Sequence, residues 1–164
     1  MHRKIIFASL FLIITTLSFI PLARADELPS AKDFTVDAKE SHAKQKPILV
    51  LFMSHSCSYC EIVLKRFLLP MQRDPAFKDR VILRQIETSS RDTLIDFDGK
   101  QTTHSAFSAK HKVWGVPHVQ LFDSHGQVLT SIVGLLTVDF YYAYLENAID
   151  ESQAKIKANS KPTW

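Results

Sequence analysis

The only two cysteines of this chain lie two residues apart, in the segment Cys57-Ser58-Tyr59-Cys60. Two thiols at this spacing can exchange between a dithiol and a disulfide. A disulfide that closes so short a loop restrains little of the unfolded chain and therefore adds little stability. The spacing predicts a redox-active dithiol, with a static structural disulfide as the alternative.

The sequence around the cysteines places them at the junction of a strand and a helix. Residues 47–53 form a continuous apolar run that begins with proline, which is typical of a strand buried on both faces. After this run, apolar residues recur at the spacing of an amphipathic helix, at Cys60, Val63, Leu64, Phe67 and Met71. The cysteine pair is therefore expected at the start of a helix.

A helix start favours the reactive form of a thiol. Unpaired backbone amides and the positive end of the helix dipole stabilise a thiolate there. Thiols at such positions have pKa values of roughly 3.5–7.5 instead of about 8.5, and the thiolate is the attacking species. We therefore expect Cys57 to be the nucleophile. Cys60, one turn further along, is expected to be the resolving thiol.

The first 25 residues have the pattern of a secretory signal. A basic start is followed by a largely apolar run from Ile5 to Ile20 and by the small-x-small segment Ala23-Arg24-Ala25. The pattern predicts a signal peptide over 1–25, cleavage after Ala25 and a periplasmic location. An uncleaved membrane anchor is the alternative, because the apolar run approaches the length of a membrane span.

The basic character of the chain belongs to this signal. The full sequence has 20 basic and 17 acidic side chains, and three of the basic ones, Arg3, Lys4 and Arg24, lie within residues 1–25. The mature chain is therefore balanced in charge, and nothing indicates a nucleic acid partner. Its length suits one domain, predicted over 26–158, followed by a frayed polar tail over 159–164.

The remaining elements are predicted from periodicity and turn signals. They are a short helix within 26–46, a short helix capped by Asp74, strands over 81–86, 119–122 and 128–133, and helices over 105–111 and after 137. Pro70 is expected to end the dithiol helix, and Thr137 to cap the last one. The apolar face of that last helix is predicted at Phe140, Tyr141, Tyr144, Leu145, Ala148 and Ile149. The polar residues 88–103 predict a surface loop, with a partner-docking loop as the alternative.

This order of elements resembles the thioredoxin superfamily, from about Phe34 to Ile149. The matching motifs are the Cys57–Cys60 segment after an apolar strand and the segment Gly115–Gly126, which leads into Val133-Gly134. The resemblance implies an α/β thioredoxin fold, with a central mixed β-sheet flanked by helices. It also implies a cis-proline beside the dithiol.

Pro117 fits the position of that cis-proline, with Val116 before it. The resemblance implies that the exposed backbone of Val116 pairs with an extended substrate segment lying across the dithiol. An ordinary trans-proline at the start of a strand is the alternative.

Three departures from thioredoxins proper narrow the resemblance. Ser56 stands where a tryptophan is usual, Ser58-Tyr59 replaces glycine-proline, and Leu51 replaces a buried carboxylate. With the export signal, these departures make the chain more similar to periplasmic thioredoxin-related proteins, such as those of cytochrome c maturation and sulfur oxidation.

The periplasmic resemblance implies a specialised thiol:disulfide oxidoreductase. Such an enzyme reduces disulfides of particular periplasmic proteins, oxidation and isomerisation being the less favoured directions. Its redox centre is the Cys57–Cys60 disulfide, and no further cofactor is expected. A membrane thiol electron-transfer protein is the expected reductant, and the protein is expected to act as a monomer.

Histidines near the cysteines leave a second function open. His55 gives His-x-Cys-x-x-Cys, and His118 follows the expected cis-proline, so both imidazoles can approach the thiols. Two thiolates and an imidazole suit Cu(I) or zinc, which makes an exported metallochaperone the main alternative. A thioredoxin-fold binding module without turnover is a third interpretation.

We favour the redox role, without a bound metal. In that role His55, Ser58, Tyr59 and His118 tune the thiolate or touch substrate. The remaining histidines of the mature chain are expected at the surface, at His42, His104, His111 and His125.

Overall fold

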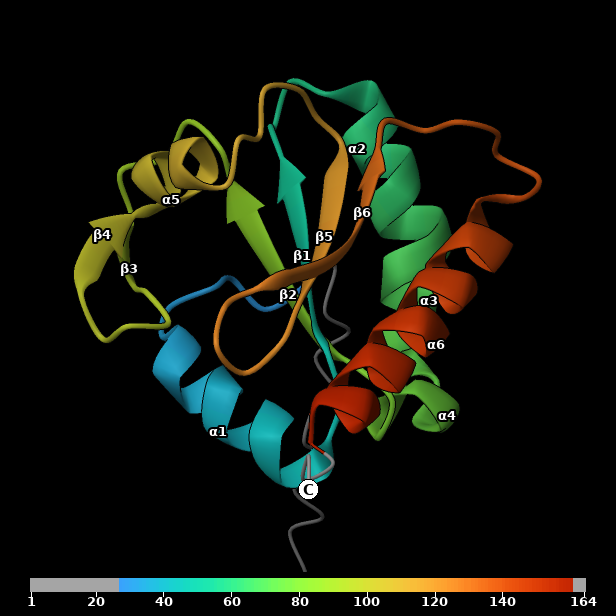
Figure 1. Cartoon of the computed structure of the whole chain (residues 1–164). Helices are drawn as coiled ribbons and strands as arrows, with labels where there is room; N and C mark the ends of the chain where they lie inside the picture. Colours follow the sequence, from blue (N-terminus) through green and yellow to red (C-terminus); the bar gives the residue numbers. More distant parts are fainter. Residues whose placement is uncertain (1–26, 161–164) are drawn as a thin grey trace, which may run out of the picture.

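The computed structural model describes residues 27–160 (Figure 1). The predicted signal peptide and its cleavage site lie outside these residues. The predicted tail is described only at its first two residues, of which Asn159 is the last of helix α6. Within residues 27–160, no helix is long and apolar enough to cross a membrane.

A four-stranded mixed sheet forms the centre of the molecule, in the order β2-β1-β5-β6. The strands are β1 (Ile48–Met53), β2 (Ile82–Glu87), β5 (His118–Phe122) and β6 (Val128–Val133). β1 pairs with β2 in parallel and with β5 antiparallel, and β5 pairs antiparallel with β6. This topology confirms the predicted α/β fold with a mixed sheet flanked by helices.

Helices cover both faces of the sheet. Helices α1 (Phe34–Lys44) and α5 (His104–Lys110) lie on one face (Figure 1). The other face is covered by α2 (Ser58–Val63), α3 (Leu69–Arg73), α4 (Pro75–Lys78) and α6 (Tyr141–Asn159). Successive side chains of a strand point to opposite faces, so β1 contributes to two hydrophobic clusters. Leu49, Leu51 and Met53 join the cluster under α2 and α6, while their neighbours join the one under α1 and α5. All six residues of β1 are buried, as its continuous apolar run predicts.

The helix that carries the dithiol continues past Pro70, so the prediction that it ends there is wrong. It runs through α2 (Ser58–Val63), a π-helical turn η1 (Leu64–Leu68) and α3 (Leu69–Arg73). In the π turn, the Leu69 N–H donates to the Leu64 carbonyl five residues back. This shift in hydrogen bonding lets Pro70, which lacks an N–H, occupy the first turn of α3. The next helix, α4 (Pro75–Lys78), is capped by Asp74 as predicted.

Residues 88–103 are not simply a loop, which corrects the prediction. They contain a two-stranded antiparallel sheet of β3 (Thr93–Ile95) and β4 (Gln101–Thr103), closed by a turn in which the Gly99 N–H donates to the Asp96 carbonyl. Leu94 is fully buried, and the Phe97 ring stacks on that of Phe34 with 4.6 Å between centroids. Two apolar residues in a polar segment therefore bind this hairpin to the core.

The last helix, α6 (Tyr141–Asn159), begins later than predicted. Thr137 does not cap it; its N-cap is Phe140, which makes no side-chain capping bond. Because the preceding residues Leu135 and Val138 pack against the core, the helix starts one turn further on. Of the six residues predicted on the apolar face, Phe140 and Tyr144 are exposed. The buried residues of α6 are Tyr141, Leu145, Ala148, Ile149, Ser152 and Ile156.

Two histidines predicted at the surface are not exposed: His104 is buried, and His111 is half-buried. His104 is buried at the start of α5, where its Nε2 lies 2.9 Å from the Ala31 carbonyl oxygen. The His111 ring packs on Phe107 with centroids 4.3 Å apart, and burial lowers the pKa of His111. The prediction rested on the polarity of histidine. It failed because a neutral imidazole can pack against aromatic rings. His42 and His125 are exposed, as predicted.

Gly126, in the turn between β5 and β6, supplies a test of the packing of Phe97. Its φ is +78°, and an added Cβ would lie 2.7 Å from the Phe97 ring. We expect Gly126→Ala to lower the free energy of unfolding by about 2–3 kcal/mol, from overpacking and backbone strain together. Gly99→Ala is the matched control, since Gly99 has φ +79° but open space around it. It should lose only about 1 kcal/mol. Equal losses in urea unfolding would contradict the contact with Phe97.

Candidate active site

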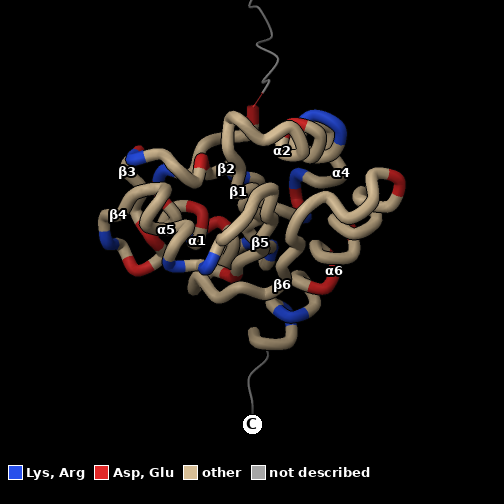
Figure 2. Tube along the Cα trace, turned by 90° about the horizontal axis from the view of Figure 1, so that it is seen from above, with Lys and Arg blue, Asp and Glu red and all other residues tan. Residues whose placement is uncertain are grey.

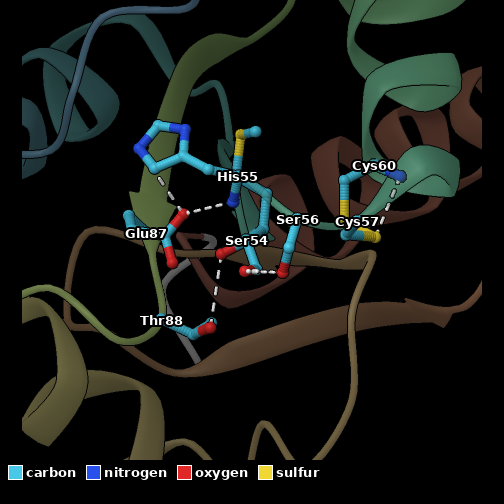
Figure 3. The surroundings of a disulfide bond; sticks show 8 residues. Ser54, His55, Ser56, Cys57, Cys60, Glu87 and Thr88 are labelled. Carbon is cyan, nitrogen blue, oxygen red and sulfur yellow. Dashed lines mark hydrogen bonds and ion pairs between the residues drawn. A yellow bond between two sulfur atoms is a disulfide. The ribbon is translucent and has the colours of Figure 1, made fainter.

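The two cysteines form a disulfide at the end of the sheet where β1 leads into α2 (Figures 1 and 3). Their Cα atoms are 5.2 Å apart. Cys57 is half-buried, whereas Cys60 is fully buried in the cluster under α2 and α6. An attacking partner can therefore reach the Cys57 sulfur and not the Cys60 sulfur, which fits the order of reaction expected from the sequence.

The local backbone explains the position of Cys57. After β1, the chain makes a turn in which the Cys57 N–H donates to the Ser54 carbonyl at 3.0 Å. Cys57 then serves as the N-cap of α2, with extended backbone angles. Its sulfur accepts the Cys60 N–H at 3.1 Å. In the reduced protein the same amide can stabilise a thiolate, because the first amides of a helix have no partner within the helix.

The bond between Val116 and Pro117 is cis, which confirms the prediction. The Pro117 carbonyl accepts the Gly134 N–H at 2.8 Å, so the segment is held between β5 and the end of β6. β5 starts at His118, which pairs with Phe52 near the end of β1. The Val116–Pro117 segment thus lies beside the end of β1 from which the chain leads to Cys57.

The two histidines near the dithiol have other partners. His55 donates its backbone N–H to Glu87 at 2.9 Å, and its ring Nε2 lies 3.8 Å from the same carboxylate oxygen. His118 is buried, and its Nε2 lies 2.7 Å from the Ser131 hydroxyl. Burial lowers the pKa of His118, which favours the neutral ring. The structure therefore brings His55 to Glu87 and His118 to Ser131.

Ser58 and Tyr59, between the cysteines, are both exposed on the first turn of α2. Leu51, where thioredoxins bury a carboxylate, is fully buried among apolar side chains. The interior beneath this dithiol is accordingly apolar at that position. Protons exchanged during the reaction must come from elsewhere.

Glu87, which belongs to no motif of the sequence, lies against the turn before Cys57 (Figure 3). A signal existed: Glu87 ends the strand that runs parallel to β1, and the carboxyl ends of parallel strands lie at the same edge of a sheet. The missing information was the register, which aligns Glu87 with Met53.

The described residues provide no obvious metal site. Over residues 27–160, the His, Cys, Asp and Glu side chains form no group of three or more that could hold a metal ion.

The charges on this part of the chain are mixed: Figure 2 shows Lys and Arg segments interspersed with Asp and Glu segments. In that view no side of the described chain carries a field of one sign.

Comparison with known proteins agrees with this geometry. A family model described as a thioredoxin-like domain matches residues 34–149. No curated protein matches the chain. Among solved structures, a thioredoxin-fold protein from Helicobacter pylori is 18% identical, with a TM-score of 0.56, over 84% of this chain and 91% of the other.

Two thioredoxins are more distant in structure. A mutant thioredoxin from Halobacterium salinarum is 21% identical, with a TM-score of 0.45, over 76% of this chain and 92% of the other. The oxidized mitochondrial thioredoxin 3 of Saccharomyces cerevisiae is 18% identical, with a TM-score of 0.48, over 76% and 94%. The family model covers most of the chain and includes both cysteines. The protein is therefore a thiol:disulfide oxidoreductase that belongs to the thioredoxin superfamily.

Proposed function

We propose that this protein is an exported reductase of disulfides in particular periplasmic proteins. The observation that carries the proposal is the asymmetry of the dithiol. Cys57 is accessible at the start of α2, and Cys60 is fully buried one turn behind it. This asymmetry gives the two thiols separate tasks, attack on the substrate and release of it.

The exchange proceeds through a mixed disulfide. The Cys57 thiolate attacks one sulfur of the substrate disulfide, and the other substrate sulfur leaves with the electron pair and is protonated. The Cys60 thiolate then attacks the Cys57 sulfur, which forms the Cys57–Cys60 disulfide and releases the second substrate thiol. The protein dithiol loses two electrons, and the substrate disulfide gains them. After this exchange the protein carries the Cys57–Cys60 disulfide, the bond that is present in the structure.

Exposed apolar side chains on segments at the dithiol end of the sheet support a protein substrate. Tyr59 lies between the cysteines and is 61% exposed. Trp114 precedes the Val116–Pro117 segment and is 83% exposed, and Leu136 follows Gly134 and is 64% exposed. Large exposed apolar groups near one site are a mark of a protein-binding surface. A polypeptide segment that crosses the dithiol could cover all three of these side chains.

The electron donor is proposed to be a membrane protein with its own exchangeable thiols. The reaction consumes the dithiol once per substrate, so a second thiol protein must reduce the Cys57–Cys60 disulfide again. The export pattern of the first 25 residues supports a periplasmic meeting place with such a donor. The same cycle needs only one copy of the chain, and we propose a monomer.

The reduction potential and the metal content of the exported protein test the proposal together. We expect a reversible two-electron couple without bound metal. Its potential should lie near the value of about −270 mV for thioredoxin rather than near about −120 mV, the value of a strong protein oxidant. Equilibration with glutathione or dithiothreitol, followed by alkylation of free thiols, measures this potential. A potential near the oxidant's value would reverse the proposed direction. Stoichiometric copper or zinc without exchange activity would replace the proposal with a metal carrier.

A further inference from the structure

One carboxylate next to the dithiol has no part in the exchange steps above. Glu87 is the last residue of β2, and its side chain is only 15% exposed. Its register partner is Met53, the last residue of β1. We propose that Glu87 is a positioning residue for Cys57, because it holds the turn that delivers this thiol to the start of α2.

The carboxylate joins two segments of chain at the edge of the sheet (Figure 3). Oε2 accepts the His55 N–H at 2.9 Å. Oε1 accepts the Ser89 hydroxyl at 2.8 Å and the Ser89 N–H at 3.4 Å. Both oxygens of Glu87 are therefore engaged, one by the turn before Cys57 and one by the chain that follows β2.

The bond to His55 lies within the turn that positions the nucleophile. Cys57 N–H donates to the Ser54 carbonyl, which makes His55 the second residue of a four-residue turn. The bond from the His55 N–H to Glu87 adds a second restraint, which ties the turn to the neighbouring strand β2. An acceptor with a full negative charge forms a stronger hydrogen bond to an amide than a neutral carbonyl does. Glu87 thereby restricts the backbone two residues before Cys57.

The imidazole of His55 contributes less than its backbone. The ring is 78% exposed, and its Nε2 lies 3.8 Å from Oε2. An ion pair at that exposure and distance is worth little in water. The positioning effect of Glu87 therefore depends on the amide bond, which does not change with the charge of the ring.

A fixed turn keeps the Cys57 sulfur within hydrogen-bonding distance of the Cys60 amide. In the reduced protein this bond is made to a thiolate and is charge-assisted. Without the anchor, the turn samples other conformations and the thiolate loses part of this stabilisation. The negative charge of Glu87 acts in the opposite sense, because it disfavours a second negative charge nearby. Removal of Glu87 therefore destabilises the Cys57 thiolate if its positioning effect dominates, and stabilises the thiolate if its charge dominates. An experiment can separate the two effects.

Alkylation of Cys57 by iodoacetamide, in a Cys60→Ser background, measures the thiolate directly. We expect Glu87→Ala to slow alkylation at pH 6–7 by about fivefold, the effect of one weakened hydrogen bond. Its half-maximal rate should move to higher pH. Glu87→Gln should alkylate at least as fast as the parent, because the amide oxygen can accept the His55 N–H. Asp98→Ala, which removes an exposed carboxylate from the β3–β4 turn, is the matched control and should leave the rate unchanged.

Two outcomes would overturn the proposal. One is an Ala variant that alkylates as fast as the parent or faster, as a purely electrostatic role requires. The other is a Gln variant that slows as much as the Ala variant. Should Glu87→Ala fail to fold by circular dichroism, Glu87→Asp replaces it, because the shorter carboxylate keeps the charge and loses its reach to His55.

The proposal rests on the proposed function for its biological meaning, and the two can fail separately. Alkylation reports on the thiolate of Cys57 whatever the substrate is. A Glu87 effect in a protein without exchange activity would remove the proposed function alone. Normal exchange with unaltered alkylation in Glu87→Ala would remove the positioning role alone.

Discussion

Cys57→Ser is expected to abolish disulfide exchange, with a loss of more than about a thousandfold in turnover, because the attacking thiolate is gone. Cys60 cannot replace it, since its side chain is fully buried behind the first turn of α2. The reduction of a protein disulfide with dithiothreitol as the electron donor, followed by the appearance of free thiols, measures this loss.

Cys60→Ser should lose turnover to a similar extent and still react once. Its Cys57 can attack the substrate, but no second thiol is present to release it. The variant should therefore accumulate a mixed disulfide, visible as a larger species on non-reducing gels. The same trapping step, applied to a cell extract, isolates bound protein substrates for identification. The double variant Cys57→Ser, Cys60→Ser is the control and should capture nothing.

The assignment of roles fails if the two single variants exchange behaviour. Capture by Cys57→Ser through Cys60 would mean that the helix start does not decide which thiol attacks. It would also require an opening of the core around Cys60, since that side chain is buried in the cluster under α2 and α6.

Arg84→Met is expected to lower the free energy of unfolding by about 3–5 kcal/mol at pH 7, since it leaves a buried carboxylate without its partner. Asp37 on α1 is 3% exposed, and both of its oxygens accept from the Arg84 guanidinium on β2. The pair fastens α1 to the sheet. The matched control is Arg80→Met, because Arg80 pairs with the more exposed Glu146 and Asp150. It should lose about 0–1 kcal/mol.

The loss caused by Arg84→Met should shrink as the pH falls. Burial raises the pKa of Asp37 above its usual value of 3.8, even though the bonds to Arg84 lower it. The folded state therefore holds this proton more tightly than the unfolded chain does. Stability from this site is fully present below pH 3.8 and is lost as the pH rises through the higher folded pKa. Without Arg84 that folded pKa rises further, so protonation relieves the buried charge as the pH falls.

Urea unfolding of the parent and both variants at pH 7 and pH 4.5 tests these expectations. A loss in Arg84→Met no larger than that in Arg80→Met would contradict a structural role for the buried pair. A loss in Arg84→Met that stays constant between the two pH values would contradict the raised pKa of Asp37. The double variant Asp37→Leu, Arg84→Met should recover most of the stability, because it leaves no unpaired charge.

Much of the candidate site is predictable from local sequence. The apolar run of β1, the spacing of the two cysteines and the periodicity after Cys60 locate the dithiol at a helix start. The position of the cis-proline came from resemblance, and the structure confirms the bond at Pro117. His55 and His118 were expected to approach the thiols, and the partners that the structure gives them, Glu87 and Ser131, were not predicted.

The errors share one physical cause. Pro70 was expected to stop the helix by its own chemistry, yet a π turn before it and packing against the core keep the helix intact. Thr137 is a good cap by type, but the packing of Leu135 and Val138 moves the start of α6 past it. In the hairpin of β3 and β4, Leu94 and Phe97 provide burial that a polar composition concealed. In each case long-range packing outweighed a local preference of about 1–3 kcal/mol per residue.

The sequence by itself determined that this chain carries one exchangeable dithiol at a strand-to-helix junction, because spacing, periodicity and helix-start chemistry are local properties. Only the tertiary structure decided which groups surround the turn before Cys57. Those features depend on the register of β2 against β1, which brings residues more than thirty positions apart into contact. Register is set by the burial of both faces of the sheet at once, and no local pattern contains it.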